Sequence, residues 1–315
     1  MNIEYVEPLS RGWNRMKKAL FRPFDLRKWF VVGFTAFLAG LTDWHGGNGT
    51  GGRSGNHVNW DAIMRFPEEA SDWLLAHPTL AILIGIGVVI LAILAVICIW
   101  LSSRGKFMFL DNVVLDRALI AQPWREYAAE ANSLFVWSLL FALVVVAILI
   151  IYVVECFTAL QSIYMVYEDP MRLLHPAIWM LVGLFGILIG VGFIDLLLTS
   201  FVVPIMYRDR LKVLEGWSRF ITIMTDYPFQ IILFALFYLL VMFVVVVAII
   251  VFGFITCCIG FILLAIPYIN SVLLLPVTYT LRAFKLEFLE QFGPEYKIFP
   301  VSEQTHGGGN LPVTP

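Results

Sequence analysis

Long apolar stretches alternate with short polar stretches, rich in aromatic and basic residues, along the whole chain. Six apolar runs can be separated, at about residues 29–44, 79–101, 134–155, 177–206, 229–254 and 259–281. A helix needs about 20 consecutive apolar residues to cross the hydrocarbon core of a bilayer. The pattern therefore predicts an all-α, polytopic integral membrane protein, a helix bundle with six transmembrane crossings.

The first and last of these runs have unusual lengths. The first is fully apolar only over residues 29–41, which as a helix would extend about 20 Å against a hydrocarbon core of about 30 Å. We expect a short spanning helix that borrows turns at both ends, and the alternative is the core of a signal peptide. At the other end, about 50 apolar residues follow Pro228, roughly twice the length of one crossing. A turn near Gly253 to Gly260 is therefore expected.

Composition supports a membrane class. Hydrophobic residues make up 60% of the 315 residues and charged residues 14%, compared with about 25% charged in soluble domains. The polar intervals are too short to enclose a core of their own. The expected organisation is a cytoplasmic amphipathic segment (1–28), one membrane domain (29–286) with an external loop (45–78), and a polar cytoplasmic tail (287–315), disordered at its end.

Basic residues are distributed unequally between the two expected sides of the membrane. Six crossings divide the chain into seven polar segments, which contain 7, 2, 4, 1, 4, 0 and 3 of the 21 lysines and arginines. Alternate segments lie on the same side of the membrane, so 18 of these residues lie on one side and 3 on the other. The positive-inside rule then predicts both termini in the cytoplasm, and the expected location is a cell membrane, in particular a bacterial cytoplasmic membrane. The basic and aromatic segments should adhere to anionic lipid headgroups, and no nucleic acid is expected as a partner.

A short pattern recurs before three of the apolar runs. Gly12-Trp13-Asn14-Arg15 precedes Pro23-Phe24, and Gly216-Trp217-Ser218-Arg219 precedes Pro228-Phe229, with a looser copy around Arg117 and Pro123-Trp124. In the first copy, Trp13, Met16, Leu20 and Phe24 share a helix face, which predicts a helix at the lipid surface. The pattern suggests a threefold pseudo-repeat of one amphipathic helix plus two crossings. The alternative is that aromatic and basic residues are common at membrane interfaces in general.

This arrangement of basic amphipathic helices before two-helix hairpins resembles several bacterial and archaeal membrane families of unknown function. The resemblance covers most of the chain and implies no activity. Mitochondrial carriers also have three two-helix units, but their signature of a proline followed by spaced acidic and basic residues is absent from this sequence.

Polar residues inside the apolar runs are the candidates for a functional site. Asp195 is near the centre of the fourth run, where a charge costs about 2.5–3.5 kcal/mol to insert, so it should face protein or water. Thr199 shares its helix face, and Asn270 and Ser271 lie between Pro267 and Pro276 in the last run. Glu155 is closer to an interface. These residues could form a proton, cation or small-solute site, or Asp195 could instead lock helices together through a hydrogen bond, for example to Asn270 or Ser271.

Catalytic and metal-binding motifs are missing from the sequence. It contains no Walker loop, HExxH, GxSxG or paired Cys and His ligands, so we expect no catalytic residues, cofactor or metal. Cys98, Cys156, Cys257 and Cys258 lie in or beside apolar runs and are expected to be small buried hydrophobes.

Three functions remain open from the sequence. The leading one is a non-catalytic membrane scaffold or organising protein. The first alternative is a small transporter or channel that uses Asp195 and the kinked last helix. The second is a lipid-modifying enzyme, which would require Glu168, Asp169 and His175 to converge on one pocket.

Overall fold

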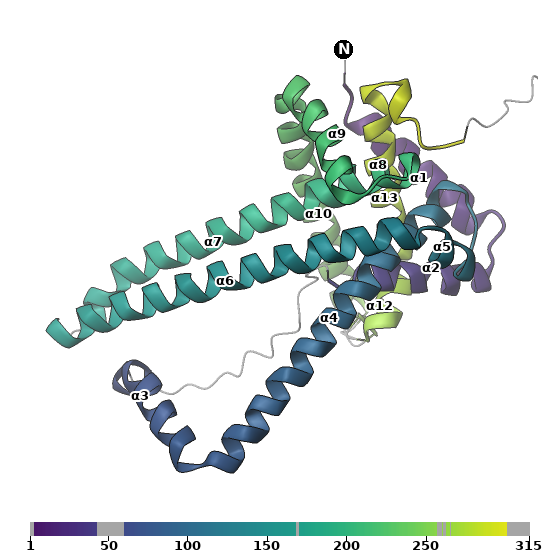
Figure 1. Ribbon diagram of the computed structural model, residues 1–315. Helices are drawn as coiled ribbons and strands as arrows, with labels where there is room; N and C mark the ends of the chain where they lie inside the picture. Colours follow the sequence, from purple (N-terminus) through teal and green to yellow (C-terminus); the bar gives the residue numbers. More distant parts are fainter. Residues whose placement is uncertain are drawn as a thin grey trace, which may run out of the picture.

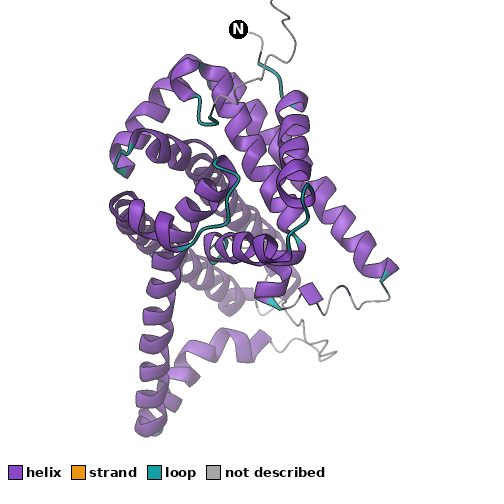
Figure 2. Cartoon of the chain, turned by 90° about the vertical axis from the view of Figure 1, so that its right-hand side faces the viewer, coloured by secondary structure: helices purple, strands orange, loops and turns teal. Residues whose placement is uncertain are grey.

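The structure is a computed structural model that describes residues 3–42, 60–167, 170–256, 260, 263, 264 and 266–300. Every regular element in these ranges is a helix (Figures 1 and 2). In chain order the elements are α1 (Val6–Phe21), α2 (Leu26–Ala39), α3 (Trp60–Ala76), α4 (Pro78–Val114), α5 (Ala121–Glu126), α6 (Ala128–Tyr167), η1 (Pro170–Leu173), α7 (Leu174–Leu197), η2 (Leu198–Val202), α8 (Val203–Asp209), α9 (Val213–Asp226), α10 (Pro228–Ile255), α12 (Pro267–Leu273), α13 (Leu275–Leu289), η3 (Glu290–Phe292) and η4 (Pro294–Tyr296). The prediction of an all-α chain is confirmed.

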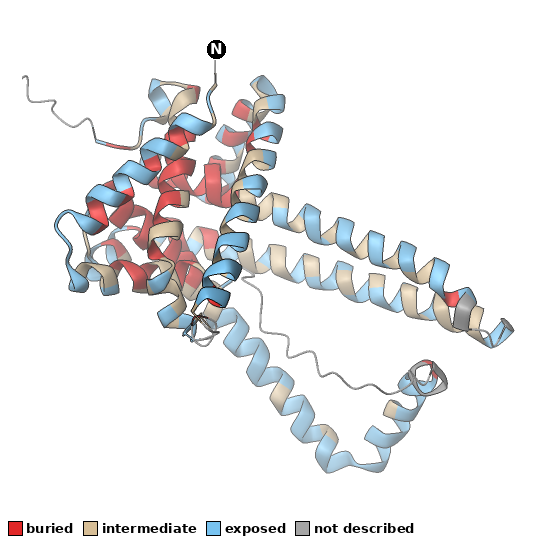
Figure 3. Cartoon of the chain, turned by 180° about the vertical axis from the view of Figure 1, so that it is seen from behind, coloured by how far each residue is buried: buried red, intermediate tan, exposed pale blue. Residues whose placement is uncertain are grey.

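Buried residues gather in one packed body, and long helices with exposed apolar surfaces lead away from it (Figure 3). Four helical stretches of the described chain are long and apolar enough to cross a membrane: Pro78–Val114, Ala128–Val166, Leu174–Asp209 and Pro228–Ile255. At most 11% of the residues in their most apolar windows are buried. Helices that are apolar all round and lack cover by protein are suited to lipid, so the chain has the features of a membrane protein.

The prediction of six crossings is not confirmed, because the first and last predicted runs differ from it. α2 has only 14 residues and packs against α4 and α12 within the body. Within 266–281, the chain forms two helices instead of one, and Pro267 and Pro276 each occupy the first turn of a helix. Proline suits that position because its fixed φ matches the helix. An N–H in the first turn would have no acceptor within the helix, so the lack of an N–H in proline costs no hydrogen bond.

The N-terminal and C-terminal parts of the body pack against each other through α1 and α13. A Cβ added at Gly12 would lie 2.9 Å from the Phe284 nitrogen, so the two backbones approach closely there. Arg15 donates to Glu287 at 2.5 Å, and Glu287 is only 3% exposed. Met16 on the predicted lipid-facing side of α1 is buried in this contact.

The polar tail predicted from residue 287 therefore begins inside the packed body. Glu287 lies in α13, and Phe292 and Phe299 beyond it belong to the buried core. Residues 301–315, which include the predicted disordered end, lie outside the described residues.

A buried carboxylate joins three segments of the body. Asp111 of α4 is fully buried and accepts hydrogen bonds from Arg117 Nε at 2.9 Å and Nη2 at 2.7 Å. Its other oxygen accepts from the hydroxyl groups of Tyr207 at 3.0 Å and Tyr127 at 3.4 Å. The Tyr127 and Tyr207 rings stack with centroids 4.8 Å apart. These contacts tie α4 to α8 and to the connection between α5 and α6.

The recurring Gly-Trp pattern has one structural counterpart. Gly216 of α9, like Gly12 of α1, lies at a close approach, since an added Cβ would be 2.9 Å from Met206 Cγ. The tryptophans differ: Trp13 is 48% exposed, whereas Trp217 packs on Trp137 with centroids 5.6 Å apart. The threefold repeat is not confirmed.

The close contact between α2 and α4 gives a first prediction. A Cβ at Gly105 would lie 2.4 Å from the Ala39 nitrogen and 2.5 Å from the Leu38 carbonyl carbon, and backbone atoms cannot move aside cheaply. We expect Gly105→Ala to reduce the free energy of unfolding by about 1–3 kcal/mol, measured by thermal unfolding in detergent.

Gly87→Ala on the same helix is the matched control, because a Cβ added there would have no atom within 4 Å. Better helix propensity should leave that variant as stable as the unaltered protein or more so. Equal melting temperatures for the two variants would contradict the close packing of α2 on α4.

Candidate functional site: a basic cavity

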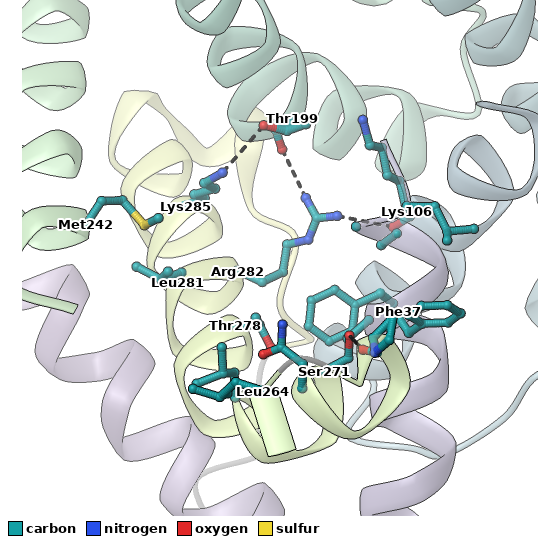
Figure 4. A pocket seen from close by; sticks show the side chains of 18 of the residues that line it. Phe37, Lys106, Thr199, Met242, Leu264, Ser271, Thr278, Leu281, Arg282 and Lys285 are labelled. Carbon is teal, nitrogen blue, oxygen red and sulfur yellow. Dashed lines mark hydrogen bonds between the residues drawn. The ribbon is translucent and has the colours of Figure 1, made fainter. Parts of the chain in front are cut away.

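A cavity of about 490 Å³ lies in the body between helices that are distant in sequence (Figure 4). Its walls come from α2, α4, η2, α10, α12 and α13. Among the described residues that line it, three are basic and none is acidic. The polar lining residues are Lys106, Thr199, Tyr238, Asn270, Ser271, Thr278, Arg282 and Lys285.

The three basic side chains lie together on one side of the cavity. Arg282 and Lys285 are neighbours on one face of α13 by their i, i+3 spacing, and Lys106 comes from α4. Lys106 is 4% exposed, Arg282 7% and Lys285 9%. Arg282 donates to the carbonyl oxygens of Thr199 at 3.1 Å and Lys106 at 3.4 Å. Lys285 Nζ lies 3.4 Å from the Thr199 hydroxyl and 4.6 Å from the centroid of the Tyr238 ring.

A local irregularity in the fourth predicted run makes the Thr199 carbonyl available. Within the π-helical turn η2, the Val203 N–H donates to Leu198 instead of Thr199. The next residue is Pro204, which has no N–H, so neither neighbouring donor can serve the Thr199 carbonyl. The freed carbonyl accepts from Arg282. Pro204 thus determines, through backbone hydrogen bonding, where the guanidinium is held.

α12 forms the opposite wall. Ser271 donates from its hydroxyl to the Pro267 carbonyl at 3.2 Å, and the Tyr268 hydroxyl donates to the Phe30 carbonyl of α2 at 3.1 Å. The side-chain oxygen of Asn270 is buried and has no hydrogen-bond partner among the described residues. A buried polar atom of this kind is unusual and is a reasonable place to look for a bound group.

Four of the five residues singled out from the sequence lie at or beside this cavity. Thr199, Asn270 and Ser271 line it. Asp195 lies one turn before Thr199, has a side chain that is 46% exposed, and is 3.7 Å from Lys106 Nζ. Asp195 therefore faces a lysine of the cavity, and this ion pair takes the place of the hydrogen bond to Asn270 or Ser271 considered from the sequence.

Glu155 lies elsewhere. It lines a separate shallow depression between α6 and α7, together with Tyr152, Cys156 and His175. Glu168 and Asp169, which the lipid-modifying hypothesis requires, lie outside the described residues. That hypothesis stays a prediction.

Sequence reasoning missed the three basic residues as site residues. They belong to the 18 basic residues assigned to the cytoplasmic side of the membrane. That assignment assumes that each basic side chain is exposed to water. A usable signal was the apolar surroundings of Arg282 and Lys285, which alternate with Phe284, Leu286 and Phe288 in one helix. A helical segment that is apolar on several faces is usually buried, together with any charges it carries.

Potential metal ligands do not gather in the described part of the chain. Within those ranges, no cluster of three or more His, Cys, Asp or Glu side chains is present. Cys98 and Cys156 are free thiols of intermediate burial, and Cys257 and Cys258 lie outside the described residues.

Fold and cavity together define an all-helical protein with membrane-type helices and a basic cavity in its packed part. The chain belongs to a family of unknown function, DUF7544, whose family model matches residues 4–289. The expected membership of an uncharacterised family without a diagnostic motif is confirmed. No curated protein and no solved structure matches the chain.

Removing the charge of Asp111 and removing the charge of Asp195 should change the stability of the protein by different amounts. Asp111→Asn removes a fully buried charge and leaves Arg117 without its carboxylate, which we expect to cost about 3 kcal/mol of unfolding free energy. Asp195→Asn weakens an ion pair whose lysine is buried but whose carboxylate is 46% exposed to solvent, so it should cost less than Asp111→Asn, about 1 kcal/mol. Denaturant unfolding in detergent compares the two variants; a larger loss for Asp195→Asn would contradict the burial described here.

Proposed function

We propose that this protein is a non-catalytic, multi-pass membrane protein that organises or scaffolds other membrane components. The observation that carries the proposal is the separation of the chain into a packed body and four long apolar helices with almost no cover from one another. A transporter normally places its solute path inside a bundle. Apolar helices that are so little buried offer lateral surface to lipids and to other membrane helices instead.

The proposed location is a bacterial cytoplasmic membrane, with the body and both termini on the cytoplasmic side. Eighteen of the 21 lysines and arginines occur in segments 1–28, 102–132, 207–228 and 282–300, which contribute to the body or its borders. Basic residues near helix ends favour the cytoplasmic side. The same segments support adhesion to anionic headgroups.

A small transporter or channel is the second candidate, and one observation favours it. Asp195 is paired with Lys106, which lines a cavity bounded by the broken helices α12 and α13. Discontinuous helices form the substrate and ion sites of many transporters.

Flux measurements separate the two candidates. We expect proteoliposomes containing the full chain to show no proton or small-ion flux above empty liposomes, and Asp195→Asn to leave this background unchanged. Flux in the unaltered protein that Asp195→Asn abolishes would overturn the scaffold proposal in favour of transport. Thr222→Ala, which changes an exposed hydroxyl on α9 outside the cavity, serves as the control variant.

A further inference from the structure

The basic cavity contains the elements of a phosphate-binding site. Three basic side chains, each at least nine-tenths buried, line one wall. Lys106 is paired with the Asp195 carboxylate at 3.7 Å, so Arg282 and Lys285 are the principal candidates to bind an anion. Arginine binds phosphate oxygens through its planar set of N–H donors, and lysine contributes a compact positive charge. We propose that the cavity binds the phosphate group of an anionic lipid headgroup, an inference that rests on the proposed adhesion to such headgroups and assigns it a specific site.

The positions of the basic groups are fixed by the fold. Carbonyl oxygens of Thr199 and Lys106 hold the Arg282 guanidinium, and the Tyr238 ring lies beneath Lys285. Figure 4 shows Lys285 and Arg282 both hydrogen-bonded to Thr199, and Arg282 also to the backbone carbonyl of Lys106. Groups that are already ordered lose less conformational entropy when a ligand binds, which raises affinity.

The remaining lining suits the rest of a headgroup. A volume of about 490 Å³ lies within the range of about 300–1,000 Å³ found for small-molecule sites. On the wall opposite the basic groups, the buried Asn270 oxygen has no partner among the described residues. That oxygen can accept a hydrogen bond from a headgroup hydroxyl, such as those of phosphatidylglycerol.

The position of the cavity favours a lipid over a soluble phosphate ester. Met242 of α10 lines it, while Leu239 and Leu240 of the same helix have exposed apolar side chains. Lys106 lies just beyond the point in α4 where exposed apolar residues give way to buried ones at Ser102. This is the depth expected for headgroups, and basic pockets between membrane helices on the cytoplasmic side are known to hold phosphate headgroups.

The test uses the full chain in detergent micelles and short-chain phosphatidylglycerol as the probe, with short-chain phosphatidylcholine for comparison. Binding is measured by native mass spectrometry over a lipid titration. Lys285→Gln should weaken phosphatidylglycerol binding about tenfold or more, the effect of losing one charge-assisted hydrogen bond. Lys28→Gln is the matched control, because it removes the same charge from a lysine that pairs with Asp116 outside the cavity.

Asn270→Ala keeps the test decisive if Lys285→Gln fails to fold, and should weaken phosphatidylglycerol binding several-fold. Glycerol 1-phosphate and inorganic phosphate are titrated as competitors, and neither should displace the lipid. If either competitor displaces the lipid at a concentration equal to that of the lipid, the proposal that the bound phosphate belongs to a lipid is wrong.

Equal binding by Lys285→Gln, Asn270→Ala and Lys28→Gln would overturn the cavity as the site while leaving general adhesion intact. If the unaltered protein does not distinguish phosphatidylglycerol from phosphatidylcholine, both the adhesion and the site are wrong.

Discussion

The buried carboxylate of Asp111 is the constraint on which the packed body depends. A charge taken out of water is tolerated only when partners compensate it, and Asp111 meets this requirement with Arg117, Tyr127 and Tyr207. These partners come from different segments, so satisfying one side chain fixes the ends of α4, α6 and α8 relative to one another. Arg210 adds to the cluster, with its guanidinium carbon 4.0 Å from the centroid of the Tyr127 ring.

This constraint explains why the long helices have two kinds of surface. In α4, residues 78–101 are largely exposed, whereas every residue of Ser102–Val114 is buried. Lipid gives no hydrophobic drive for helix association, so helices in a membrane rely on close backbone packing and hydrogen bonds. In α4 such packing is concentrated at the body end, at Gly105 and at the hydrogen bond from Ser102 to the Ala39 carbonyl. The apolar ends beyond the body remain available to lipid.

Sequence reasoning located the apolar runs of α4, α6, α7 and α10 because run length and lack of charge are local properties. It could not foresee the body, since its ion pairs join residues far apart in the chain, such as Arg15 and Glu287. Thr199 was recognised as a site candidate because it is a polar residue in an apolar run. Arg282 was missed because the count of basic residues by segment assumes that each one is exposed to water. Burial by contacts with distant parts of the chain does not change that count.

The π-helical turn at Leu198–Val202 connects the lipid-facing part of the chain to the cavity. It is the C-terminal continuation of the long helix α7, and its Thr199 carbonyl holds Arg282 of α13. The Val203 N–H is already bonded to Leu198, and Pro204 has no N–H with which to continue the π-type pattern, so the Thr199 carbonyl is left for Arg282. A group that binds beside Arg282 would therefore lie next to the contact that joins α7 to the body.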